Sequence, residues 1–173
     1  MTKAIFPGTF DPIHYGHIDI ALRAAKLFEK LYVAVYDRPL KNLLFSPKER
    51  ISLVKQSFKQ ANIEVIGYNS LTVDLCKQVD ASVIVRGLRV FSDFEYEFRM
   101  ALANNRLNPD IDVVAFITSE QHTFLSSSTV REIASLDGDV SSMVPPHVVT
   151  ALDVKLKKLD AEKRRGYFSS LRD

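Results

Sequence analysis

Short apolar runs alternate with segments of helical period along most of this chain, and this alternation constrains its fold more than any other feature. The run Leu31–Tyr36 is apolar at almost every position, which is typical of a strand buried on both faces. Between such runs, apolar residues recur every three or four positions, as in helices that cover a sheet. We therefore predict a single α/β domain: a doubly wound sheet of about five parallel strands with right-handed crossovers, followed by C-terminal helices.

The expected elements follow in a regular order. We expect strands at Lys3–Phe6, Leu31–Tyr36, Ile63–Ile66, Ser82–Val85 and Asp112–Ile117. We expect helices from near Gly16, from Ser46 to about Gln60, over Leu71–Val79, from Ser92 to about Leu107, after Ser126 to near Leu136, and from Pro145-Pro146 onward.

Two pairs of residues have the spacing of a capping box, which marks a helix start. Ser46 and Glu49 form the first pair, and Ser92 and Glu95 form the second. In the helix predicted after Ser92, apolar residues recur at helical spacing, which predicts a buried stripe. Its members are Phe94, Phe98, Ala101 and Leu102.

Length and composition limit the classes of protein that fit. With 173 residues, of which 46% are hydrophobic, the chain can bury one ordinary core. We assign that domain to residues 1–159 and interpret 160–173 as a charged, exposed extension. The net charge of +2 does not indicate a nucleic-acid partner, and the single cysteine, Cys76, permits no intrachain disulfide. Because no apolar run is long enough to span a bilayer, we expect a soluble, cytoplasmic protein with no membrane partner.

The stretch Ala4–His17 carries the residues best suited to chemistry. It joins an apolar strand to a helical segment through a turn rich in Pro and Gly, and Thr9, His14 and His17 stand at that junction. A helix start offers unpaired N–H groups and the positive end of its dipole, which together favour an anion. The dipole favours a neutral imidazole at His17, whereas a bound phosphate would favour the charged form. We expect a phosphate group as the ligand.

Other polar side chains also follow predicted strands. Lys41 follows the second strand, Arg86 and Arg89 follow the fourth, and the serines Ser126–Ser128 follow the fifth. Ligands of parallel sheets bind at the carboxyl ends of the strands, where the strand order reverses. Arginine forks bind phosphate oxygens through two N–H groups, and a second helix start can hold further phosphates. The sequence thus predicts that four separate loops meet at one edge of the sheet.

Each of these residues also has a purely structural interpretation. His17 could cap or pack its own helix, and the lysine could be an ordinary solvated side chain. Arg86 and Arg89 could pair with Asp93 or Glu95 at the next helix start. The serines could supply only a helix cap, and for one of the three we expect that role.

Several other classes of site lack the residues that they need. His14 and His17 could be two zinc ligands, but no cysteine or acidic partner lies at a matching spacing, and we expect no protein metal site. No Gly-Lys-Ser or Gly-Lys-Thr P-loop is present, and no Gly-x-Gly-x-x-Gly follows the first strand. A Gly-x-Ser-x-Gly elbow for acyl transfer is also missing. Kinase-type, dinucleotide-binding and serine-hydrolase functions therefore find no support.

Several motifs resemble those of one group of enzymes. His14-Tyr15-Gly16-His17 is similar to the signature of the nucleotidylyltransferase superfamily. Pro-Gly-Thr-Phe-Asp-Pro upstream, Arg86-Gly87-Leu88-Arg89, the block Asp93–Glu97 and the serine run together resemble phosphopantetheine adenylyltransferase, from Ala4 to about Leu159. The resemblance implies a Rossmann-like homohexamer that transfers an adenylyl group reversibly from ATP to 4′-phosphopantetheine with Mg²⁺ present. The products would be 3′-dephospho-CoA and pyrophosphate.

The resemblance also implies roles for particular positions. His17 would stabilise the transition state, with Thr9, Lys41 and Arg89 as further catalytic residues. The acceptor would contact Thr9, Lys41, Thr72, Arg86 and Asn105. ATP would contact Thr9, Phe10, His17, Gly87, Leu88, Arg89, Glu97, His122, Thr123, Phe124, Leu125, Ser126, Ser127 and Ser128. In-line attack at the α-phosphorus builds charge on oxygen atoms, so it needs mainly positioning and positive charge, which these residue types supply.

The sequence leaves two alternative functions. A sister nucleotidylyltransferase acting on nicotinamide mononucleotide or a phosphorylated alcohol would share the first motif, although the block from Arg86 to Glu97 favours the pantetheine enzyme. A non-catalytic nucleotide-binding module would share the fold, although it would be expected to lack His17, Lys41 or Arg86, and all three are present. Pyrophosphate release with each acceptor separates the three functions.

Overall fold

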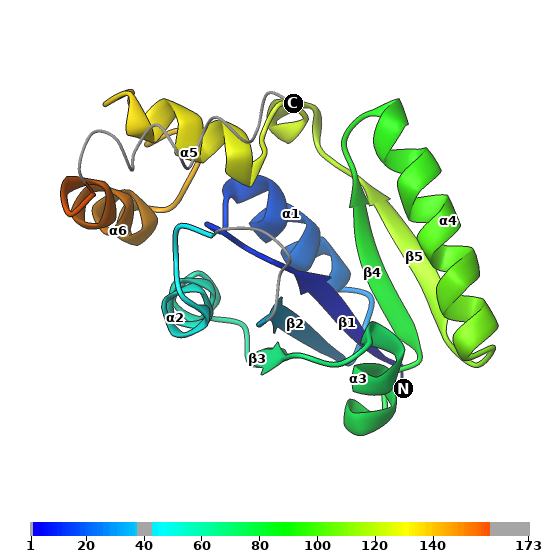
Figure 1. Cartoon of the computed structure of the whole chain (residues 1–173). Helices are drawn as coiled ribbons and strands as arrows, with labels where there is room; N and C mark the ends of the chain where they lie inside the picture. The colour runs from blue at the N-terminus through cyan, green and yellow to red at the C-terminus, as the bar shows by residue number, and fades with distance from the viewer. Residues whose placement is uncertain (1, 38–42, 160–173) are drawn as a thin grey trace.

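The computed structural model describes residues 2–37 and 43–159 of the chain. Lys41 and the predicted extension 160–173 lie outside the described residues. Strands and helices alternate from the N-terminus to the last strand, as the sequence predicts (Figure 1). The strands are β1 (Lys3–Gly8), β2 (Lys30–Tyr36), β3 (Ile63–Tyr68), β4 (Val83–Leu88) and β5 (Asp112–Ile117). The helices are α1 (Tyr15–Ala24), α2 (Pro47–Gln56), α3 (Thr72–Val79), α4 (Phe91–Leu107), the 3₁₀ turn η1 (Glu120–His122), α5 (Ser127–Ser135) and α6 (Pro146–Lys157).

The five strands form one parallel sheet in the order β3-β2-β1-β4-β5. This is the predicted doubly wound, Rossmann-like arrangement, and the strand order reverses at the central strand β1. Three strands are longer than expected at their carboxyl ends, because β1 reaches Gly8, β3 reaches Tyr68 and β4 reaches Leu88. Arg86 and Gly87 consequently belong to the end of a strand rather than to the loop behind it. No helix in the described part of the chain is long and apolar enough to cross a membrane.

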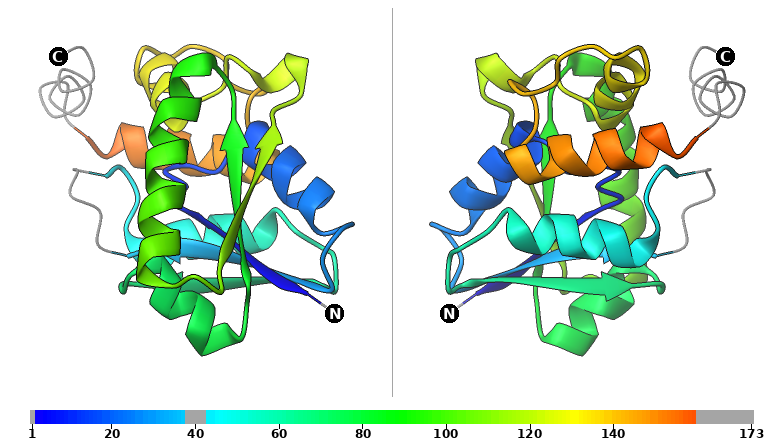
Figure 2. Two further views of the ribbon diagram at one scale, coloured as in Figure 1. Left: turned by 90° about the vertical axis from the view of Figure 1, so that its right-hand side faces the viewer. Right: turned by 90° about the vertical axis from the view of Figure 1, so that its left-hand side faces the viewer.

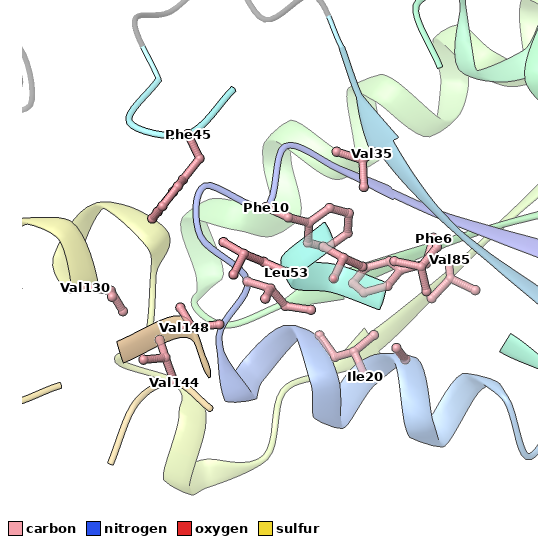
Figure 3. Close-up of a cluster of buried hydrophobic side chains, with 14 of the residues drawn as sticks. Phe6, Phe10, Ile20, Val35, Phe45, Leu53, Val85, Val130, Val144 and Val148 are labelled. Carbon is pink, nitrogen blue, oxygen red and sulfur yellow. The ribbon is translucent and has the colours of Figure 1, made fainter. Parts of the chain in front are cut away.

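Successive side chains of each strand point to opposite faces of the sheet, so each face has its own core. Ala4 and Phe6 of β1 belong to a large core together with buried side chains of α1, α2, α5 and α6. Ile5 belongs to a smaller core, which α3 covers with Val73, Leu75 and Cys76. Figure 3 shows Phe10 beside Phe6 within the large core, with Val130 and Val148 toward α5 and α6.

Local signals place several helix starts correctly. The Ser46 hydroxyl accepts a hydrogen bond from the Glu49 N–H at 3.4 Å, and the Glu49 carboxylate accepts one from the Ser46 N–H at 2.7 Å. This confirms the first capping box, although α2 ends at Gln56 rather than near Gln60. The Ser126 hydroxyl accepts from the Thr129 N–H at 3.0 Å, which confirms one serine as a cap.

Helix α4 departs from the prediction in two ways. It begins at Phe91, one residue before Ser92, and the Ser92/Glu95 capping box does not form; the Asp93 carboxylate instead accepts the Arg89 N–H at 3.0 Å. Its predicted buried stripe is also wrong for the single chain, because Phe94, Phe98 and Leu102 are 51%, 52% and 58% exposed. The helix covers the part of the sheet formed by β4 and β5 (Figure 2), so only one of its sides faces the rest of the protein.

Candidate functional site

A cavity of about 530 Å³ opens at the carboxyl edge of the sheet, where the strand order reverses. All five strands line it, together with the first residues of α1, α3 and α5 and one side of α4. The predicted convergence of loops after the first, fourth and fifth strands is therefore confirmed. From the second strand, Tyr36 at the end of β2 lines the cavity, while Lys41 of the following loop lies outside the described residues.

The turn after β1 is fixed by an aromatic side chain. Phe10 has a φ of 51°, in the left-handed region that residues other than glycine rarely adopt. Its ring contacts Phe6 edge-on, with centroids 5.7 Å apart, and His17 edge-on at 5.0 Å. A Cβ on Gly8 would lie 2.8 Å from this ring, so glycine is needed there for the close approach. Packing of Phe10 thus compensates the unfavourable turn and holds Thr9 at the cavity wall.

His17 is held as a neutral imidazole at the start of α1. Its Nδ1 accepts a hydrogen bond from the backbone N–H of His14 at 3.3 Å, so the ring proton of the neutral form is on Nε2. The two histidine rings stack with centroids 3.6 Å apart. Burial, followed by the positive charges of Arg89 and Arg86, lowers the pKa of His17 to about 3. His17 can therefore donate a hydrogen bond to a phosphate oxygen at neutral pH without carrying charge itself.

Arg86 is oriented by Glu97 across the floor of the cavity. Its Nε and Nη2 donate to the two carboxylate oxygens of Glu97, both at 2.6 Å, and its Nη1 donates to the Pro7 carbonyl at 3.1 Å. Burial opposes the charge of this guanidinium, but the paired carboxylate outweighs burial and the pKa of Arg86 is raised. A planar fork held in this way stays charged and presents its other N–H groups in a fixed direction.

Arg89 forms a salt bridge at the start of α4 and also lines the cavity. Its guanidinium pairs with Asp93 at 3.1 Å, which is the salt bridge that the sequence left open. It also donates to the Leu125 carbonyl at 3.0 Å and lines the cavity. The pair therefore ties β4 to the segment before α5 and keeps a positive charge at the cavity wall.

The serines after β5 divide into different roles. Ser126 caps α5, and the Ser127 hydroxyl donates to the Pro12 carbonyl at 2.9 Å, so that the start of α5 is fixed against the turn of β1. Both of these residues line the cavity, whereas Ser128 does not. Two helix starts, those of α1 and α5, thus face one cavity, and each can stabilise negative charge.

Most of the predicted site residues lie on this cavity wall. They are Thr9, Phe10, His17, Thr72, Arg86, Gly87, Arg89, Glu97, His122, Ser126 and Ser127. Predicted ATP contacts that do not line the cavity are Leu88, Thr123, Phe124, Leu125 and Ser128. Leu125 is buried beneath the wall, and Phe124 is exposed.

Asn105, a predicted acceptor contact, does not line the cavity. The cavity side of α4 carries Asp93, Glu97, Ala101 and Asn104, which recur at helical spacing. Asn105 is one position further along, roughly 100° around the helix, and its side chain is exposed. Asn104, not Asn105, is the amide at the wall.

Sequence reasoning missed three buried charged residues beneath the turn of β1: Asp11, Arg50 and Arg131. A signal for Arg50 was present, because it shares helical spacing with Leu53 and Val54 on the buried face of α2. Two tyrosines were also not predicted from the sequence. Tyr36 and Tyr68 lie at the ends of β2 and β3, with ring centroids 5.1 Å apart, and both line the cavity.

No three His, Cys, Asp or Glu side chains within residues 2–37 and 43–159 are grouped closely enough to hold a metal ion. The cavity instead offers a neutral imidazole donor, two guanidinium groups and two helix starts. This set of groups can bind a polyphosphate and stabilise charge that develops on its oxygens.

Comparisons with known proteins agree with that chemistry. Residues 5–133 match the family described as cytidylyltransferase-like. A phosphopantetheine adenylyltransferase of Roseiflexus sp. (strain RS-1) is 54% identical over 88% of this chain and 96% of its own length. One of Caldanaerobacter subterraneus subsp. tengcongensis is 50% identical over 91% of this chain and 99% of its own length. A solved nicotinic acid mononucleotide adenylyltransferase of Plasmodium falciparum is similar in fold alone, with a TM-score of 0.66 at 15% identity over 91% of this chain and 96% of its own.

Proposed function

This chain belongs to the phosphopantetheine adenylyltransferase family, and from that membership we propose how its cavity performs the family's reaction. The enzyme is a nucleotidyltransferase of coenzyme A biosynthesis. A phosphate oxygen of 4′-phosphopantetheine attacks the α-phosphorus of ATP, the bond to the β-phosphate oxygen breaks, and pyrophosphate leaves. The other product is 3′-dephospho-CoA, and the transfer is reversible.

The observation that carries this proposal is the joint placement of His17 and Arg86 on one cavity wall. An in-line transfer of a phosphoryl-type group needs little covalent chemistry from the protein and depends on positioning and charge stabilisation. His17 supplies a neutral N–H donor for the oxygens of the reacting phosphorus, and Arg86 supplies a charged fork. Negative charge that grows in the transition state is thereby stabilised without a proton transfer from His17.

We assign the ATP side of the cavity to the end of β4 and the start of α5. Arg89 and Ser127 face the cavity from these elements. Gly87 lines the cavity at the end of β4, where an added Cβ would clash with the Ile20 side chain of α1. His122 follows β5 in the turn η1 and its ring stacks near Tyr15, with centroids 6.4 Å apart. The helix start at Ser126 favours the outer phosphates of ATP.

We assign the acceptor side to the turn of β1 and to the ends of β2 and β3. Thr9 and Arg86 would bind the acceptor phosphate, and Lys41, by family resemblance, would add a third group. Thr72, Tyr68 and Asn104 line the continuing part of the cavity and would contact the pantetheine arm. The hydroxyls of Tyr68 and Thr72 lie 3.4 Å apart, so this part offers polar groups to the amides of the arm.

We propose that Mg²⁺ enters with ATP. Magnesium is commonly held by substrate phosphates and water with few protein ligands, which fits a cavity rich in cationic and N–H groups. When bound, the ion would neutralise charge on the phosphate oxygens. The residues that would lie nearest to these phosphates are those of the α5 start and Arg89.

We also propose that the enzyme is a homohexamer that works in the cytoplasm. Support for an assembly comes from α4, whose Phe91, Phe94, Phe98 and Leu102 side chains are exposed in the single chain. Exposed apolar patches of this kind mark interfaces between proteins. A second copy of the chain would cover them.

The decisive experiment is an acceptor panel. Purified protein is incubated with ATP, Mg²⁺ and either 4′-phosphopantetheine, nicotinamide mononucleotide or a phosphorylated alcohol, and pyrophosphate release is measured. We expect release with 4′-phosphopantetheine, and a loss of about 100- to 1,000-fold in rate for His17→Ala. His147→Ala is the matched control, because His147 lies on α6 and bonds to Ser57 and the Leu53 carbonyl, away from the cavity. Release confined to nicotinamide mononucleotide would contradict the proposal.

A further inference from the structure

Arg50 is fully buried beneath the turn of β1, although it belongs to the helix α2. Its Nη1 donates to the Thr9 carbonyl at 2.7 Å and to the Tyr36 carbonyl at 2.8 Å, and its Nε donates to the Phe45 carbonyl at 3.3 Å. These three carbonyls come from the turn after β1, the end of β2 and the segment before α2. Thr9 and Tyr36 both line the cavity.

Asp11 makes a second connection between the same segments. Its carboxylate oxygens accept hydrogen bonds from the Leu44 N–H at 2.9 Å and the Phe45 N–H at 2.8 Å. Arg131 of α5 also contacts Asp11, with Nη1 3.4 Å from Oδ2 and a hydrogen bond to the Asp11 carbonyl. One buried network therefore joins the turn of β1, the end of β2, the segment before α2 and the helix α5.

Stability alone does not require a guanidinium at this place. A buried charge loses its hydration, and well-packed apolar side chains often replace buried ion pairs at no cost in stability. Burial accordingly lowers the pKa of Arg50, while the nearby carboxylates of Asp11 and Asp37 oppose that effect. An apolar side chain could not donate hydrogen bonds, however. The planar guanidinium of Arg50 donates to several carbonyls at once and so fixes their directions.

We propose that Arg50 is a positioning residue for adenylyl transfer: it holds the Thr9 backbone at a fixed distance from the ends of β2 and of the segment before α2. This inference rests on the proposed function, because Thr9 is the part of the turn that would contact the acceptor phosphate. Arg50 itself does not line the cavity. Its effect reaches the reaction only through the carbonyl of Thr9 and through the strand end at Tyr36.

The test compares Arg50→Lys and Arg50→Ala with the wild type. Arg50→Lys keeps the positive charge and loses the fork. We expect its kcat to fall by about 10- to 100-fold, the scale of a misplaced group, and its KM for 4′-phosphopantetheine to rise. The Kd for ATP, measured by calorimetry without acceptor, should change less than the KM for 4′-phosphopantetheine, because most of the groups assigned to ATP lie on β4 and α5. In Arg50→Ala, millimolar methylguanidinium should restore part of the lost kcat.

Leu152→Ala is the matched control for loss of stability. Leu152 is fully buried in α6 and lies outside the cavity wall. Truncating it should lower the Tm at least as far as Arg50→Lys does, and its kcat, both KM values and its response to methylguanidinium should match those of the wild type. Amide exchange around Phe10 should be faster in Arg50→Lys and unchanged in Leu152→Ala.

The outcomes separate this inference from the function on which it rests. If the wild type shows no turnover with 4′-phosphopantetheine, the proposed function fails, and amide exchange around Phe10 still tests whether Arg50 fixes the turn. If the wild type is active and folded Arg50→Lys keeps both its kcat and its acceptor KM, the positioning role is overturned. It is equally overturned if kcat falls only in proportion to the unfolded fraction. If Arg50→Ala does not fold, the Arg50→Lys comparison decides alone.

Discussion

The backbone N–H of His14 donates a hydrogen bond to Nδ1 of His17 across 3.3 Å. This contact fixes the tautomer, so that the neutral ring of His17 carries its proton on Nε2. Because burial and the nearby arginines lower the pKa of His17 to about 3, the ring is uncharged at neutral pH. His17 is thus a neutral hydrogen-bond donor near pH 7, and its pKa does not fit a proton carrier between pH 6 and 8.

The first prediction concerns the pH dependence of the rate. Since kcat/KM reports ionisations of the free enzyme, its profile should show no step from His17 between pH 6 and pH 8. Nitrogen-15 spectra of the imidazole should show a protonated Nε2 and an unprotonated Nδ1 over that range. A loss of rate as the pH rises through about 6.5, present in the wild type and absent in His17→Gln, would indicate a required imidazolium.

The second prediction concerns stability at acid pH. Burial lowers the pKa of His17 to about 3 in the folded chain and lowers the pKa of His14 well below its usual range. An unfolded histidine titrates near 6.5, so between that pH and about 3 the unfolded state binds more protons. The stability that these neutral rings contribute is complete above about pH 6.5 and is lost as the pH falls. The Tm of wild type should therefore drop more between pH 7.5 and pH 5 than that of His17→Gln. Equal drops would contradict the pKa of His17.

The third prediction uses the two glutamates of α4. Glu97 pairs with Arg86 at 2.6 Å in the cavity, whereas Glu95 pairs with Arg99 at 3.6 Å on the exposed side of the same helix. Glu97→Gln keeps the shape but removes the charge that orients Arg86, so kcat/KM for 4′-phosphopantetheine should fall by about tenfold or more. Glu95→Gln should leave it unchanged, because surface pairs contribute little. Steady-state kinetics with both variants would decide, and equal effects would argue against the orienting pair.

The fourth prediction distinguishes two neighbouring amides. Asn104 lines the cavity, whereas Asn105 is exposed on another side of α4. If Asn104 bonds to the pantetheine arm, Asn104→Ala should raise the KM for 4′-phosphopantetheine by roughly fivefold, the value of one hydrogen bond. Asn105→Ala is the matched control and should leave both KM values unchanged. A larger effect from Asn105 would place the arm elsewhere.

The strands and the shared edge were predictable because their signals are local. A run such as Leu31–Tyr36 reads as a buried strand whatever surrounds it, and parallel strands bring their carboxyl ends together by topology alone. The start of α4 was not predictable from local spacing, since Asp93 is engaged by Arg89 rather than by a capping box. Helical spacing places Arg50 on the buried face of α2, but it does not indicate which groups Arg50 contacts. Its acceptors Thr9 and Tyr36 are 41 and 14 positions away in the chain, and no local pattern announces such contacts.

The fifth prediction concerns the exposed apolar face of helix α4. The spacing of Phe94, Phe98 and Leu102 predicts a face that avoids water, yet all three side chains are exposed in the single chain. In the single chain the rings of Phe94 and Phe98 stack on each other, with centroids 5.9 Å apart, and both are about half exposed. Apolar area of this extent is costly to leave in water, so a second copy of the chain should cover it.

Phe98→Glu places a charge in that face and should dissociate the assembly, because a buried carboxylate without a partner is unfavourable. Light scattering after size exclusion should report six copies for the wild type and a smaller species for this variant. Leu27→Glu is the matched control, since Leu27 is also an exposed apolar residue, at 69%, and follows α1. The control should keep the mass of the wild type. If Phe98→Glu also keeps it, α4 is not the interface, and the exposed aromatic side chains of this helix would need another partner.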